Sequence, residues 1–220
     1  MSLPDNLRSQ HGGPIAARVA AESAAEIVAA TRTWLEKAVI GLDLCPFAHA
    51  VHVKNQIRYA VSAAETPQTL LADLVDELQL LASADRGEVE TTLLIHPWVL
   101  ADFLHYNDFL AVADAAVANL RLAAVIQVAS FHPQYQFDAA GPDDIDNYTN
   151  RSPYPTLHLL RQESVDRALA AFPDPARIFE KNIATLRVLG HEGWNRLGLA
   201  APSTPALPGR PAAGPEGTSS

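Results

Sequence analysis

The stretch IRYAVSAAETPQTLLADLVDELQLLASADRGEVETTLLI, residues 57–95, decides the fold. It opens with Ile57, Tyr59 and Val61 in the two-residue alternation of a half-buried strand. Thr66 and the proline after it then begin a helix, in which leucines recur at three- and four-residue intervals. The apolar run VETTLLI closes the stretch as a second strand. A strand, a helix and a strand in this order predict one unit of an α/β layered fold.

The segments on either side of this unit extend the same order. The elements expected there are a helix at 15–41, a helix capped by Asp102, a strand at about 124–130, a loop at 131–151, a helix entered through Ser152-Pro153-Tyr154-Pro155 and ending near Phe172, and a helix capped by Asp174 and stopped by Gly190. Consecutive strand-helix-strand units imply right-handed crossovers. We therefore predict a single layered α/β domain with a small, largely parallel sheet and flanking helices. A ferredoxin-like α+β arrangement with an antiparallel strand is the alternative.

Both ends of the chain lack a periodic apolar pattern. Residues 199–220 are rich in Pro, Gly and Ser, and residues 1–14 carry two prolines and a Gly-Gly pair. Such segments cannot bury enough apolar surface to offset the entropy of ordering them. We therefore expect disordered tails at 1–14 and 199–220 and a single domain at 15–198.

Charge and composition exclude several classes of protein. The 220 residues carry 16 Lys and Arg against 25 Asp and Glu, a formal net charge of −9. Nucleic acids and anionic membrane surfaces are bound through clustered Lys and Arg, so we expect neither as a partner. No long apolar segment predicts a signal peptide or a spanning helix, which favours a cytoplasmic location. The single cysteine, Cys45, excludes a disulfide framework within the chain.

Two expected strands end in the same dipeptide, at His96-Pro97 and at His132-Pro133. In open α/β sheets, ligands bind beyond the carboxyl ends of the strands. Two parallel neighbours would therefore bring His96 and His132 into one site, as metal ligands or as an acid and a base. The structural alternative is that each histidine caps its strand and hydrogen-bonds a loop carbonyl.

Cys45 follows the first long helix, within the sequence LDLCPFAH. Its apolar neighbours favour a small buried side chain. A cysteine paired with a histidine from another segment is also a known nucleophile arrangement. A mixed Cys/His metal site is a third interpretation, although the chain has no tight ligand spacing.

The loop at 131–151 and the segment after it concentrate polar, aromatic and proline residues, as small-molecule sites do. Arg151 and Ser152 stand where we expect the next helix to begin, and a helix N-terminus beside a guanidinium is suited to an anion. An N-cap serine with a solvated arginine is the structural alternative. The candidate catalytic residues are His132, Cys45 and Tyr135, and the candidate substrate-binding residues are Asn147, Tyr148, Asn150, Arg151, Ser152 and His158.

Three functions are compatible with these candidates. The first is an enzyme acting on a small anionic metabolite, with His132 as acid or base, Arg151 holding the anion and Cys45 as a nucleophile if it faces the same cleft. The second is a metal-binding protein in which His96, His132 and Cys45 coordinate a divalent metal. The third is a small-molecule binding module without catalysis.

The strings LCPFA, SFHPQYQF and NYTNRSPYPTLHLLR are long and specific. They resemble the bacterial and plastid family known as domain of unknown function 1415, over about residues 31–194. The resemblance implies a housekeeping role in the cytoplasm or plastid and no particular reaction. It draws attention to residues that the local patterns also select, namely Cys45, His96, His132, Tyr135, Asn150 and Arg151.

Overall fold

A computed structural model describes residues 14–170 and 175–199. The expected tails lie outside the described residues, apart from Pro14, which begins the first helix, and Leu199. The expected helix cap Asp174 also lies outside them.

Four strands form one sheet in the order β1-β2-β4-β3. The strands are β1 (Ile57–Val61), β2 (Thr91–Ile95), β3 (Ile126–Phe131) and β4 (Thr156–Arg161). β1 and β2 pair in parallel, whereas β4 is antiparallel to both β2 and β3. The predicted α/β class is confirmed, and β1, β2 and β3 all run in one direction. Because β4 lies between β2 and β3, the only parallel ladder of the described sheet joins β1 to β2.

The strand β4 corrects the expected helix from Ser152 to about Phe172. The helix α5 (Gln162–Ala170) begins only where β4 has ended. Pro155 favours an extended conformation at Tyr154, and a proline just before the first residue of a strand costs no ladder hydrogen bond. The strand passes into α5 without a Gly or Pro between them, so the helical period of the second segment concealed the alternation of the first.

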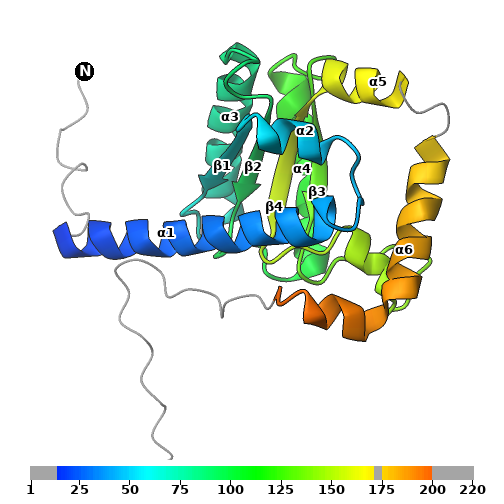
Figure 1. The fold of residues 1–220 in the computed structure, drawn as a ribbon. Helices are drawn as coiled ribbons and strands as arrows, with labels where there is room; N and C mark the ends of the chain where they lie inside the picture. The colour runs from blue at the N-terminus through cyan, green and yellow to red at the C-terminus, as the bar shows by residue number, and fades with distance from the viewer. Residues whose placement is uncertain (1–13, 171–174, 200–220) are drawn as a thin grey trace, which may run out of the picture.

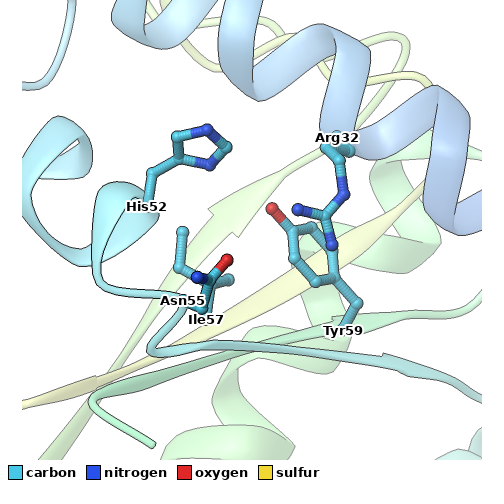
Figure 2. Close-up of a pocket in the computed structure, with 5 residues that line it drawn as sticks. All are labelled: Arg32, His52, Asn55, Ile57 and Tyr59. Carbon is cyan, nitrogen blue, oxygen red and sulfur yellow. The ribbon is translucent and has the colours of Figure 1, made fainter.

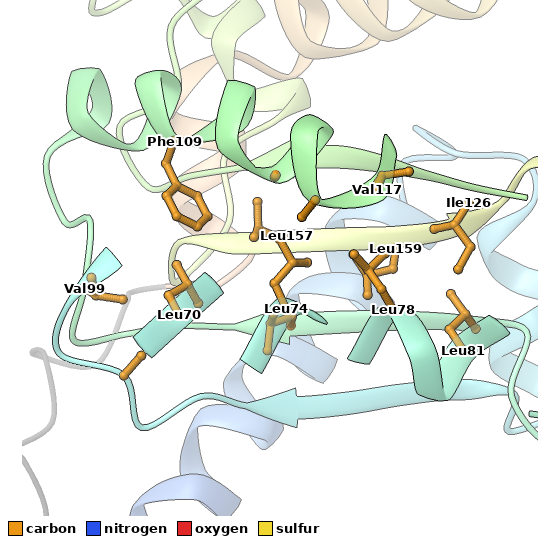
Figure 3. Packing of buried hydrophobic residues seen from close by; sticks show 14 of the residues in the cluster. Leu70, Leu74, Leu78, Leu81, Val99, Phe109, Val117, Ile126, Leu157 and Leu159 are labelled. Atoms are coloured by element: carbon orange, nitrogen blue, oxygen red, sulfur yellow. The ribbon is translucent and has the colours of Figure 1, made fainter. Parts of the chain in front are cut away.

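Helices cover both faces of the sheet (Figure 1). On one face, α3 (Pro67–Ser83) buries leucines, and α4 (Phe103–Asn119) buries Phe109 and Val117, against Leu157 and Leu159 of β4 (Figure 3). On the other face lie α1 (Pro14–Trp34), its π-helical continuation η1 (Leu35–Ile40), and α6 (Pro175–Arg196). The short helices α2 (Ala48–Val53) and η2 (Ile145–Thr149) complete the described elements.

The expected helix boundaries have identifiable causes. Thr66 caps α3 by accepting the Thr69 backbone N–H, and Asp102 caps α4 by accepting two backbone N–H groups. Gly190 has a φ of 62° and interrupts α6, as its predicted role as a helix stop requires. No helix in the described part of the chain combines the length and apolar character needed to cross a membrane.

Candidate functional site

Two histidines lie where β2 and β3 end beside the start of β4. Thr156 of β4 pairs with the last residue of both strands, and His96 and His132 follow directly. The ring of Tyr106 from α4 contacts both imidazoles, with centroid distances of 5.7 Å to His96 and 5.0 Å to His132. Its hydroxyl donates to the Thr156 carbonyl at 2.9 Å and accepts the Phe131 N–H at 3.1 Å. The fold thus brings the two histidines together around a tyrosine that ties the strand ends.

Both imidazoles are fully buried, and backbone groups occupy most of their nitrogens. His132 accepts the Gln134 N–H on Nδ1 at 3.0 Å, so its Nε2 carries the proton that is donated to the Leu100 carbonyl at 3.1 Å. His96 donates from Nδ1 to the Val99 carbonyl at 3.1 Å. Its Nε2 is buried without a hydrogen-bond partner among the described residues. These contacts match the structural alternative, in which each histidine bonds a loop carbonyl.

Burial keeps these histidines neutral. It lowers the pKa of His96 to about 4 and also lowers the pKa of His132. An acid-base role for His132 would require at least one of its two backbone hydrogen bonds to open. Metal coordination by the pair would likewise displace the backbone partners of His132, and within the described residues no group of three or more His, Cys, Asp or Glu side chains is placed to hold an ion.

Cys45 lies apart from the histidines, in the apolar cluster around Trp34 on the α1 face of the sheet. Burial raises the pKa of its thiol, with a smaller opposing effect from the backbone N–H groups of Phe47 and Ala48. The thiol therefore stays protonated near neutral pH. This environment matches a small buried side chain and does not favour a nucleophile.

The asparagines among the candidates hold the backbone in place, and the candidate histidine on β4 contacts a side-chain hydroxyl. Asn147 is fully buried, accepts the Phe137 N–H on Oδ1 and donates from Nδ2 to the Gly141 carbonyl. Asn150 donates to the Ser130 carbonyl at 3.1 Å. His158 is on β4, where its Nε2 lies 2.7 Å from the Thr91 hydroxyl, and burial lowers its pKa to about 4.

The guanidinium of Arg151 bonds two separate backbone carbonyls of its own loop. Nε donates to the Tyr135 carbonyl at 3.2 Å, and Nη2 donates to the Pro142 carbonyl at 2.6 Å. The guanidinium carbon lies 4.4 Å from the centroid of the Tyr148 ring, in a cation–π contact. The ring of Tyr135 packs against Phe103 and Phe137. Arg151 is therefore fixed in one orientation by its own loop.

The expected helix N-terminus at Ser152 is absent, which corrects one part of the predicted anion site. Ser152 is followed by an irregular turn and then by β4, and its hydroxyl donates to the Tyr154 carbonyl at 2.6 Å. No set of free helical N–H groups therefore lies beside Arg151. Any anion bound there must rely on side chains.

Three of the candidates nevertheless line one cavity of about 160 Å³ on the α1 face. Its walls include Trp34, Tyr148, Arg151, Ser152, Trp194 and Leu199, together with two prolines. We call it the Arg151 cavity. Tyr148 meets Trp194 edge to face at 4.9 Å, so aromatic rings form much of the wall. The volume is below the 300–1,000 Å³ or so of sites for drug-sized molecules, which suits a smaller ligand.

The sequence patterns did not identify Trp34 and Trp194 as walls of a site. Both residues stand at apolar positions that recur with helical spacing. This spacing is the same whether the side chains pack in the core or line a cavity. They are separated by most of the chain, and only the packing of α6 against α1 and η1 brings them together.

The comparisons with known proteins agree with the resemblance in the sequence. Residues 26–196 match the profile of a family described as protein of unknown function (DUF1415). The chain belongs to this family, and its described residues form a mixed α/β structure with one four-stranded sheet. No curated protein and no solved structure matches it.

The buried histidines predict a loss of stability in acid. His96 and His158 have folded-state pKa values of about 4, below the ordinary 6.5, so the unfolded chain binds more protons between these values. The contribution of these neutral histidines to the free energy of unfolding is therefore fully present above about pH 6.5. As the pH falls to about 4, each histidine lowers the free energy of unfolding by on the order of 3 kcal/mol. Urea denaturation across this range measures the effect.

A matched pair of variants identifies the source of that pH dependence. His158→Gln removes one buried imidazole and should make the pH dependence less steep, whereas His49→Gln, at an exposed side chain on α2 without an ion pair in the described part of the chain, should leave it unchanged. The same pH dependence in His158→Gln and in the wild type would contradict this assignment.

Proposed function

We propose that the protein binds a small carboxylate, or a related anion with an apolar ring, in the Arg151 cavity. The observation that carries the proposal is the guanidinium of Arg151, held 4.4 Å from the Tyr148 ring on the wall of a cavity that two tryptophans also line. Aromatic walls suit a flat apolar body, and a guanidinium suits a planar carboxylate.

The loop contacts of Arg151 favour binding because they fix the cation before a ligand arrives. Nε and Nη2 are occupied by carbonyls, and within the described residues Nη1 has no hydrogen-bond partner. Holding a side chain in its bound orientation lowers the entropy that binding costs. The Nη1 N–H groups are the donors that we assign to the anion.

Asp144 and Asp146 of the loop contact groups other than the guanidinium of Arg151. Asp146 pairs with Arg187 through two oxygens, at 3.0 and 2.6 Å. Asp144 accepts the Gly141 N–H at 2.6 Å. The hydrogen bonds of Arg151 go to carbonyl oxygens, which leave its positive charge uncompensated.

The lining supports binding more than catalysis. The described residues of the wall include no histidine or cysteine, and the Ser152 hydroxyl donates to a backbone carbonyl with no general base beside it. Of the three functions compatible with the sequence, we therefore propose the small-molecule binding module. We propose further that the ligand is met in the cytoplasm, and that the net charge of −9 makes nucleic acid an unsuitable partner.

Benzoate is a direct probe, and benzamide is its uncharged control. We expect benzoate to quench the fluorescence of the cavity tryptophans and to bind at roughly millimolar concentration or tighter, and benzamide to bind more weakly.

Leu199→Trp places a bulky ring in the cavity without removing a hydrogen bond named above, and should abolish benzoate binding. The same change at Leu104, 70% exposed on α4, is the control. Equal binding of benzoate and benzamide, or binding that survives Leu199→Trp, would contradict the proposal.

Arg151→Lys tests the guanidinium itself. Lysine keeps the charge but loses the planar donors, so we expect benzoate affinity to fall about tenfold to a hundredfold, or roughly 1.5 to 3 kcal/mol. The melting temperature should also fall, because the bonds to Tyr135 and Pro142 are lost. Calorimetric titration of the folded variant separates the two effects. A lower melting temperature with unchanged affinity would mean that Arg151 only holds the loop.

A further inference from the structure

A second cavity, of about 70 Å³, lies between α1, α2 and β1 (Figure 2). Arg32, His52, Asn55, Ile57 and Tyr59 line it, so four of its five lining residues have polar side chains. Figure 2 shows the Arg32 guanidinium, the Tyr59 hydroxyl and the His52 ring around one common space. None of these residues lines the Arg151 cavity.

No carboxylate among the described residues pairs with the cation in this cavity. The Arg32 guanidinium carbon lies 4.8 Å from the centroid of the Tyr59 ring. Within the described residues the guanidinium makes no ion pair or hydrogen bond, whereas Arg58, on the same strand as Tyr59, forms two hydrogen bonds to Glu77. A ring contact leaves all the N–H donors of an arginine available. Arg32 can therefore donate two parallel hydrogen bonds to an oxyanion.

Tyr59 supplies a donor that the protein itself does not use. Its hydroxyl oxygen is buried and has no hydrogen-bond partner among the described residues. A buried polar group without a partner is costly, and such groups in folded proteins call for an explanation. Burial raises the pKa of this hydroxyl, which therefore keeps its proton and can donate.

His52 and Asn55 are the other two polar residues of the cavity wall. Asn55 adopts a φ of 56°, and its backbone N–H donates to the His52 carbonyl, so the turn that carries both side chains is defined. Among the described residues, the contacts place Glu36 near the cavity, with its Oε1 3.6 Å from Nε2 of His52. No hydrogen bond or ion pair joins Glu36 to Arg32 there.

We propose that this cavity binds a phosphate group, with Arg32 and the Tyr59 hydroxyl as its principal donors. The volume corresponds to roughly five water-sized spaces, which is room for one tetrahedral oxyanion and not for a whole nucleotide. The phosphate is either a free ion or the terminal group of a phosphomonoester whose remainder extends into solvent. This site is independent of the carboxylate site at Arg151.

Titration of the full-length protein with inorganic phosphate, followed by NMR, tests the proposal. Arg32→Gln should weaken phosphate binding about tenfold or more, because the bidentate charged contact is lost. Tyr59→Phe removes only the hydroxyl and should weaken binding about fivefold, while the folded state becomes no less stable. Arg177→Gln, at an exposed arginine on α6, is the matched control and should bind phosphate as the wild type does.

Glycerol phosphate distinguishes the two sources of the phosphate. Tighter binding than inorganic phosphate, with the same dependence on Arg32 and Tyr59, identifies the terminal group of a larger molecule, and weaker binding identifies the free ion.

The proposal is overturned if Tyr59→Phe binds phosphate as tightly as the wild type, if Arg177→Gln loses as much affinity as Arg32→Gln, or if the wild type does not bind millimolar phosphate. Benzoate binding should persist in all these variants, so failure here is separable from failure at Arg151.

Discussion

The insertion of β4 between β2 and β3 joins the described strands into one sheet. Without β4, β2 would present an unpaired edge and β3 would lose its only partner in the described sheet. Thr156 pairs with the ends of both neighbours, and its carbonyl accepts the hydroxyl of Tyr106, which also accepts the backbone N–H of Phe131. One tyrosine from α4 thus fixes the end of the sheet from which the long loop departs. The histidines that follow β2 and β3 are buried by the same arrangement.

The polar residues of the loop have two roles in this arrangement. Some only hold the backbone, whereas Arg151 also lines a cavity. Asn147 and Asn150 use their side chains to hold backbone, so that the irregular segment between β3 and β4 has a defined course. Arg151 does the same with two of its nitrogens, and its guanidinium is presented beside Tyr148 on the α1 face. The α3/α4 face is closed by leucine packing. Both cavities described here therefore lie on the face covered by α1, η1 and α6.

Sequence periodicity predicted most of the fold, because β1, α3, β2, α4 and β3 each carry a clear apolar period or cap. The strand β4 was missed because a short strand that joins directly to a helix offers no break between its own period and that of the helix. That error also placed a helix N-terminus at Ser152, where none exists. Tyr148, Arg151 and Ser152 were found by composition, whereas Trp34, Trp194 and Arg32 become site residues only through contacts between distant segments.

We propose that the aromatic cavity, on whose wall β4 and its loop place Arg151, accepts a small carboxylate. Intermolecular NOEs between benzoate and the protein test it most directly, because they report which side chains surround the bound ring. We expect NOEs from the benzoate ring to the side chains of Trp34, Tyr148 and Trp194. NOEs to residues elsewhere, or none from saturating benzoate to these three rings, would contradict it.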